Sequence, residues 1–175
     1  FVAAHDGFTI HDMVSYNQKH NEANLEDNKD GNDSNRSWNV GHEGETSDAT
    51  INQVRHRLKK SLLATLMLSS GVPMLNMGDE VSRTQNGSNN GYSLPLDHSV
   101  PSVESYGGGW ALPWQLNEMQ ADTLAAMQSL SQIRETYLAD VASEFFTGAL
   151  DKGTNRKDIA WFSLGGNEMS DDHWR

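Results

Sequence analysis

The sequence predicts an α/β fold with parallel βαβ topology. Two apolar runs, residues 1–4 and 72–77, each lead into an acidic residue, Asp6 or Asp79, and a long helical pattern separates them. A strand buried on both faces reads as a continuous apolar run, and parallel strands place their carboxyl ends at one edge of the sheet. We therefore expect a strand, a helix and a strand, with the acids at the edge where α/β barrels keep their chemistry.

Composition excludes several classes of protein. The chain has 175 residues, the length of one ordinary domain, and its 24 acidic and 13 basic residues give a net charge of −11. That charge opposes binding to nucleic acid, since the bases cluster only at 55–60. No run approaches the roughly 20 apolar residues of a membrane-spanning helix. The lack of cysteine excludes disulfides and thiolate metal sites and fits a reducing compartment, so we expect a cytoplasmic protein with no membrane or nucleic-acid partner.

The first elements follow from residues 1–47. Phe1 opens inside the first apolar run without an initiator methionine, and Trp174 lies beside the other end, so we expect a piece of a longer polypeptide. A short helical pattern follows at 9–17. A polar tract then runs from 19 to 47, and its Trp38 indicates an ordered loop, because a disordered tract has little use for an indole ring.

Two long helices are predicted from apolar spacing and caps. The first begins after Ser47 or Asp48 and ends near Ser69, with Gly71 as its stop. The second begins after Asn117, where Gln120 completes a capping box. Its apolar face is formed by five residues at helical spacing: Leu124, Met127, Leu130, Ile133 and Tyr137.

The end of the chain predicts a different kind of structure. Residues 159–164 read as a strand, and Gly165 and Gly166 read as the hairpin turn that follows it. We place a domain boundary near Ser143, which divides the chain into residues 1–143 and residues 144–175.

Metal and phosphate sites are not favoured by the motifs. Asn28, Asp30 and Gly31 match part of a calcium loop, but Ser37 stands where the bidentate acid is required. The four histidines at 5, 11, 20 and 42 lack the helical i, i+4 spacing of a zinc pair. No nucleophile elbow or glycine-rich phosphate loop is present, so we expect no metal and no cofactor.

His5 and Asp6 are the leading candidates for a functional site, although an Asp-Gly pair is also common turn chemistry. The acidic strand ends are accompanied by loops that carry His, Asn, Arg, Trp and Tyr. Amides and carboxylates bind hydroxyl groups and aromatic rings cover sugar faces, so this mixture suits a neutral, hydroxyl-rich ligand. Sugar chemistry is one of several uses of such a site.

The chain resembles the isoamylase-type glycogen debranching enzymes of the α-amylase superfamily, glycoside hydrolase family 13. The motifs that carry the resemblance are FVAAHDGFT, then DMVSYNQKHNEAN, then DG, SWN and G-x-E-G. The string LLATLMLSSGVPMLNMGDE with RTQNGSNNGY looks like the last barrel strand of that family and its loop, and NEMSDDHW is similar to the start of its C-terminal β domain. The likeness covers nearly the whole chain.

The resemblance implies a fold and a set of site residues. The fold is a partial (β/α)8 TIM barrel, its last two βα units, followed by the start of an all-β domain and largely helical in isolation. Asp6 matches the third catalytic carboxylate of the family and His5 matches a histidine that binds the same sugar. A further four residues are implied to contact substrate at the rim: Asp79, Glu80, Arg83 and Asn90. For Asp79 and Glu80 a structural role is the alternative.

The implied activity is hydrolysis of α-1,6 branches in glycogen or related α-glucans by a retaining mechanism. The nucleophile and the acid/base residue of the family lie on earlier strands outside this chain, so we expect the chain alone to be inactive and, with open sheet edges, to self-associate. The chain departs from the family at residues 92–97 and at Leu25, which leaves glucan preference open. The alternatives are a non-catalytic α-glucan-binding or assembly module and, third, a transglycosylase.

Overall fold

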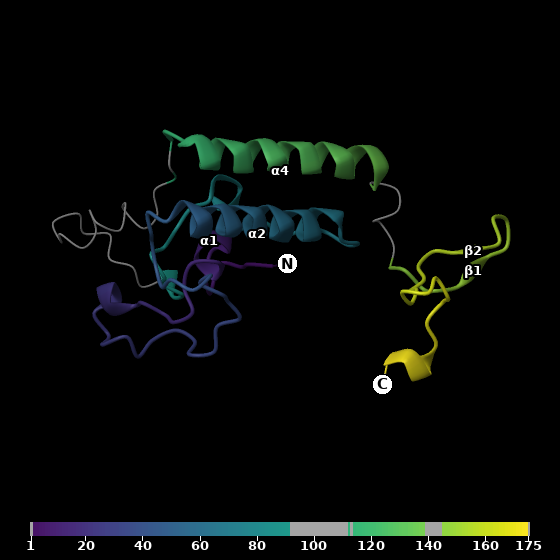
Figure 1. Cartoon of the computed structure of the whole chain (residues 1–175), viewed down its shortest axis with the longest axis horizontal. Coiled ribbons are helices and arrows are strands. Elements are labelled where there is room, and N and C mark those ends of the chain that lie inside the picture. The colour runs from purple at the N-terminus through teal and green to yellow at the C-terminus, as the bar shows by residue number, and fades with distance from the viewer. Residues whose placement is uncertain (1, 92–111, 113, 139–144, 175) are drawn as a thin grey trace.

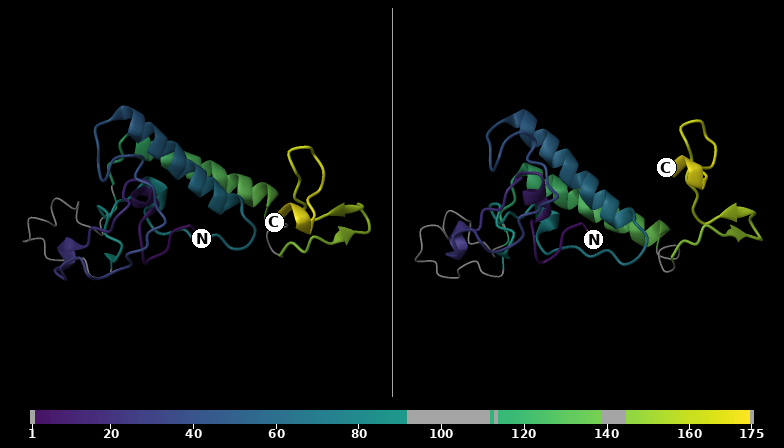
Figure 2. Two further views of the ribbon diagram at one scale, coloured as in Figure 1. Left: turned by 60° about the horizontal axis from the view of Figure 1, so that its bottom comes forward. Right: turned by 90° about the horizontal axis from the view of Figure 1, so that it is seen from below.

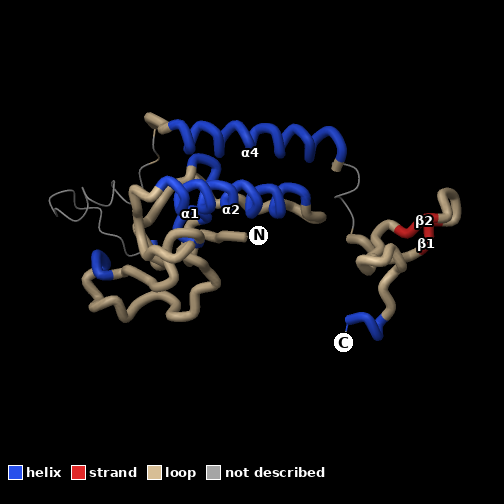
Figure 3. The backbone as a smooth tube through the Cα atoms, in the orientation of Figure 1, coloured by secondary structure: helices blue, strands red, loops and turns tan. Residues whose placement is uncertain are grey.

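The computed structural model describes residues 2–91, 112, 114–138 and 145–174. Three α-helices lie within these ranges, α1 (Ile10–Met13), α2 (Ala49–Leu68) and α4 (Glu118–Tyr137), together with two short strands, β1 (Leu150–Asp151) and β2 (Arg156–Lys157) (Figures 1 and 3). Single 3-10 turns occur at Glu22–Asn24, Asp79–Val81 and Asp171–Trp174. None of the described helices has the length and apolarity needed to cross a membrane.

The two long helices begin where their capping residues predict. Asp48 accepts hydrogen bonds from the N–H groups of Thr50 and Ile51 at the start of α2. Asn117 and Gln120 form the predicted capping box of α4. The helices pack side by side with their N-termini at the same end (Figures 1 and 2).

The helix predicted at 9–17 is shorter in the structure. Thr9 caps it, but the helical turn ends at Met13. The carbonyl group of Met13 accepts a hydrogen bond from Trp38, and that of Ser15 accepts one from Gly44. These acceptors are taken by the polar tract, so the helix is not continued.

A small apolar core joins both ends of the predicted βαβ unit to the helices. Ala3, Ile10 and Leu63 are buried at its centre. Partly buried apolar residues surround them. These come from the N-terminal segment, α2, the second apolar run and α4: Val2, Met13, Leu62, Leu75, Met127 and Leu130. The two apolar runs therefore pack in one cluster with α2, as their apolar character requires.

Neither apolar run forms a regular strand. Residues 2–4 and 72–77 carry no strand assignment, and no backbone hydrogen bond joins the two runs within the described parts of the chain. A strand exists through ladder hydrogen bonds to a neighbour, and neither run has one here. The partial barrel thus stays a prediction.

The C-terminal residues form a separate, loop-rich unit (Figure 2). β1 and β2 pair antiparallel, with Leu150 opposite Lys157. The hairpin turn predicted at Gly165 and Gly166 is present, because Phe162 and Glu168 form an antiparallel bridge, although 159–164 is not a regular strand. The boundary predicted near Ser143 lies outside the described residues.

Candidate functional site

His5 and Asp6 lie on the surface where the first apolar run ends. Their side chains are 87% and 74% exposed, and His5 Nε2 lies 3.1 Å from Asp6 Oδ2. The next residue, Gly7, donates its backbone N–H to the carbonyl oxygen of Asn89 at 2.9 Å. This bond places the exposed pair beside the loop that follows the second apolar run.

A network of asparagine side chains holds that loop against the polar tract. Asn21 and Asn89 exchange two hydrogen bonds of 2.9 Å, since Asn21 Nδ2 donates to Asn89 Oδ1 and the Asn89 N–H donates to Asn21 Oδ1. Asp30 Oδ2 accepts from the side-chain amides of Asn24 at 2.7 Å and Asn90 at 2.8 Å. Burial opposes the charge of Asp30, but these hydrogen bonds lower its pKa. The loop beside Asp6 is therefore anchored by amide contacts.

Asn28 and Asp30, which match part of a calcium loop in sequence, form hydrogen bonds in the same network. Asn28 Oδ1 accepts the N–H of Asn21, and Asp30 Oδ2 accepts the two amides described above. The part of the chain that the structure describes contains no group of three or more His, Cys, Asp or Glu residues able to hold a metal ion.

Asp79 and Arg83 lie inside the fold rather than at a rim. Asp79 is 1% exposed, and its Oδ1 accepts the N–H of Ile10 at 2.9 Å. Burial raises the pKa of Asp79 to about 6, because the carboxylate loses its hydration. Arg83 is buried as well and donates to Met77 O at 3.1 Å and to Gln85 Oε1 at 3.0 Å.

The other two predicted substrate contacts are also used internally. Glu80 Oε2 accepts the N–H of Gly78 at 2.8 Å, which closes the turn around Asp79. The Asn90 amide is bonded to Asp30. Of the six predicted site residues, the structure exposes His5 and Asp6 and places Asn90 in the neighbouring loop. Asp79 and Glu80 have the contacts of the structural alternative, and Arg83 is buried with internal partners.

Asp12 is a residue that the sequence did not single out. It is fully buried in α1, and its carboxylate accepts from Thr84 Oγ1 at 2.5 Å and from the Gln85 N–H at 2.8 Å. Burial raises its pKa, although the neighbouring His11 and these hydrogen bonds oppose the shift. The contacts tie α1 to the loop that reaches Asn89.

Glu43 has a comparable role in the polar tract. Its carboxylate accepts the N–H groups of Asn17 and Gln18 and side-chain contacts from Asn39 and His20. Burial works against the ionised form, but the hydrogen bonds outweigh it and lower the pKa of Glu43 to about 2. Sequence spacing does not identify Asp12 or Glu43, because most of their hydrogen-bond partners lie far away in the chain.

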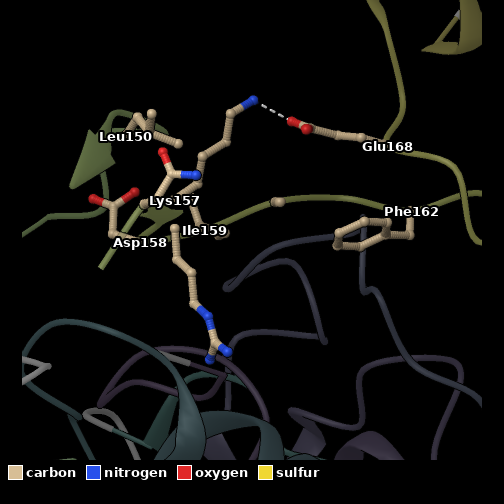
Figure 4. A pocket seen from close by; sticks show the side chains of 9 residues that line it. Leu150, Lys157, Asp158, Ile159, Phe162 and Glu168 are labelled. Carbon is tan, nitrogen blue, oxygen red and sulfur yellow. Dashed lines mark hydrogen bonds and ion pairs between the residues drawn. The ribbon is translucent and has the colours of Figure 1, made fainter. Parts of the chain in front are cut away.

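The C-terminal unit contains a hollow with a volume of about 440 Å³. Figure 4 shows Lys157 directed toward Glu168, with which it forms an ion pair, and Phe162 on the same side of the hollow as Glu168. The hollow is open, and two bases and two acids line it: Arg156, Lys157, Asp158 and Glu168. It brings together none of the predicted site residues.

No model of a known protein family matches the chain. The chain is 43% identical over 175 residues to a glycogen operon protein GlgX homolog of Mycobacterium bovis, which covers 99% of this chain and 23% of that protein. It is 55% identical over 115 residues to a glycogen debranching enzyme of Pectobacterium atrosepticum (62% of this chain, 18% of that protein). It is 50% identical over 100 residues to the chloroplastic isoamylase 1 of Oryza sativa subsp. japonica (57% and 12%).

The chain spans less than a quarter of the length of these curated relatives. The names of these relatives agree with the resemblance that was predicted from the motifs around His5, Asp6 and Asp79. The predicted resemblance is therefore confirmed. The chain corresponds to a partial region of relatives named glycogen operon protein, glycogen debranching enzyme and isoamylase, and it is similar to these isoamylase-type debranching enzymes.

Proposed function

We propose that the full-length protein hydrolyses α-1,6 branch linkages in glycogen or a related α-glucan. The observation that carries this proposal is the 43% identity along nearly the whole chain to a glycogen operon protein, together with the debranching and isoamylase names of the other relatives. The substrate is then an α-glucan polysaccharide. A cytoplasmic location is also proposed, although several plant relatives carry chloroplastic names.

The proposed mechanism is retaining, with a covalent glycosyl-enzyme intermediate formed by one carboxylate and released with the help of a second. Asp6 would bind hydroxyl groups of the sugar being cleaved and would favour its distorted, oxocarbenium-like transition state. Its exposure and its position beside the Asn89 loop support this role, since a substrate can reach it. His5 would bind the same sugar and orient the Asp6 carboxylate, 3.1 Å away.

The test of this role is debranching by the full-length protein with and without Asp6→Asn. The substitution removes the charge and retains the shape, so turnover should fall by about a hundredfold or more with an unchanged circular dichroism spectrum. Asp27→Asn is the matched control, because Asp27 is equally exposed and its left-handed backbone suits asparagine. Unchanged turnover in Asp6→Asn would exclude the assigned role.

The chain by itself is proposed to lack the nucleophile and the acid/base residue. The purified 175-residue chain should therefore release no linear chains from a branched glucan under conditions in which the full-length protein does. Measurable debranching by the chain alone would contradict the proposed division of the catalytic residues. If the full-length protein binds glucan without cleaving it, the alternative of a glucan-binding module is correct.

A further inference from the structure

A cleft of about 260 Å³ lies between the N-terminal half of α2 and the first turn of α4, and we call it the α2–α4 cleft. It is separate from His5 and Asp6. Residues from five parts of the chain line it, among them His11, Glu45, Lys59, Ser82, Asn117 and Met119.

Lys59 places a buried cation in this cleft. The residue is 5% exposed, and its Nζ donates to Ser82 Oγ at 2.9 Å and contacts His11 Nδ1 at 3.2 Å. Both partners are neutral acceptors, and no carboxylate lies within ion-pair distance of Lys59 in the described ranges. An ammonium group has three N–H donors, so one is left for a further acceptor. A buried charge without a counter-charge is costly, and an anion would relieve that cost.

His11 separates Lys59 from the nearest acid. A charged lysine can only donate, so Nδ1 of His11 accepts from it and the Nε2–H group donates to Glu45 Oε1 at 2.8 Å. The imidazole ring therefore stands between the ammonium group and the Glu45 carboxylate. Burial lowers the pKa of Lys59 to about 8, against the attraction of Glu45, which leaves the ammonium form dominant at pH 7.

The helices add positive potential at the same place. Both N-termini lie at one end of the helix pair, and each carries the positive end of a helix dipole (Figures 1 and 2). In α4 the N–H groups of Gln120 and Ala121 bond to Asn117, whereas those of Glu118 and Met119 have no intrahelical acceptor. Met119 and Lys59 both line the cleft, so the first turn of α4 and the Lys59 side chain border the same space.

We propose that the α2–α4 cleft binds a small oxyanion, phosphate or sulfate, between the Lys59 ammonium group and the first turn of α4. An oxyanion offers several acceptors to convergent donors, and helix N-termini receive such groups readily. The cleft volume is ample for one such ion. Arg55 is a second base in the lining of the cleft.

The test is a titration of the 175-residue chain with sodium phosphate at pH 7, followed by amide NMR, with sodium chloride holding the ionic strength constant. We expect saturable shifts of the Glu118 and Met119 amides, and the same shifts with sulfate. A parallel titration with a hexose monophosphate distinguishes the free anion from a phosphorylated sugar. Tighter binding of the sugar phosphate assigns the site to it, and equal or weaker binding assigns the site to the free anion.

Three variants decide the assignment. Lys59→Met should weaken phosphate binding at least about tenfold, because it removes the buried charge and keeps most of the side-chain volume. Arg57→Met makes the same change of charge at an exposed position of α2 and should leave the affinity within about twofold. Glu45→Gln removes the acid and should tighten binding about threefold or more.

The proposal is wrong if the wild-type shifts are reproduced by sodium chloride alone, or if Lys59→Met and Arg57→Met bind phosphate equally. Should Lys59→Met fail to fold, Glu45→Gln decides the question. Its side chain is 59% exposed, so the fold should tolerate the change, and an unchanged affinity in this variant would overturn the site.

Discussion

Arg55 is buried in α2 and donates to carbonyl groups of the polar tract. Its guanidinium group binds Gly44 O at 2.8 Å, Asn39 O at 2.9 Å and His42 O at 2.5 Å. Burial lowers the pKa of Arg55, against the attraction of Glu45, which shows that these carbonyls replace water around the charge. One side chain thus holds residues 39–44 of the polar tract, which have no regular structure, against α2.

Arg55→Met should lower the free energy of unfolding by about 3 kcal/mol, because several carbonyl groups lose a charged donor at once. Urea denaturation monitored by tryptophan fluorescence measures the change. Arg57→Met, at an exposed position of the same helix, should change stability by less than about 0.5 kcal/mol. Equal effects of the two substitutions would show that the carbonyl contacts contribute little.

Asp79 predicts a pH dependence of stability. Burial raises its pKa to about 6, helped by Asp12 and Glu80 and opposed by the Ile10 N–H and by Arg83. The folded state therefore holds the proton more tightly than the unfolded state, whose value is 3.8. The contribution of Asp79 to stability is fully present below pH 4 and is lost as the pH rises through 6.

Asp79→Asn should remove this loss. The amide oxygen can still accept the Ile10 N–H, so the variant should gain stability relative to the wild type between pH 4 and pH 7, by at most about 3 kcal/mol. Thermal unfolding across that range measures the difference. A constant difference at all pH values would mean that the Asp79 pKa is not raised.

The stability of the long helices depends on the capping of their ends as well as on the packing of their apolar faces. The capping box of α4 satisfies a first-turn donor, since the Gln120 N–H bonds to Asn117 Oδ1 at 3.0 Å. Asn117→Ala should lower the free energy of unfolding by about 1 kcal/mol and reduce the amide protection of the first turn. Hydrogen exchange measured by NMR tests this prediction, with Ser129→Ala in the middle of α4 as the control. If both substitutions lower protection equally, the cap is not the cause.

The helix ends and the apolar runs differ in how well the sequence predicts them. The cap of α4 was predicted to be Asn117 and that of α2 to be Ser47 or Asp48, and the structure has Asn117 and Asp48, because capping side chains act on backbone groups two or three positions away. Both apolar runs were predicted to be buried strands, and Ala3 and Leu75 do pack in the core cluster. Neither run has a strand assignment, since a strand depends on a neighbour that local sequence does not specify.

At the scale of the molecule, the second apolar run presents hydrophobic side chains to solvent. Val72 is 96% exposed and Met77 is 69% exposed, and the backbone of this run is not paired in a sheet. Apolar surface of this kind beside unpaired backbone favours association between chains.

The isolated chain should therefore self-associate at concentrations on the order of 100 µM. Val72→Asp should shift it toward the monomer, because it places a charge within the exposed run. Leu164→Asp is the control, since Leu164 is fully exposed in the C-terminal unit. Sedimentation equilibrium measures both. A monomeric wild type, or an equal effect of the control, would contradict an association through the second apolar run.

The sequence by itself predicted the resemblance to isoamylase-type debranching enzymes, the two long helices and the candidate acid Asp6, because motifs, caps and the end of an apolar run are local signals. Only the tertiary structure decided that Asp79 faces the N-terminus of α1 and that Lys59 lies buried in the α2–α4 cleft. Burial and hydrogen-bond partners come from residues far apart in the chain. Those contacts decide whether a charged group meets solvent, a ligand or the protein's own backbone.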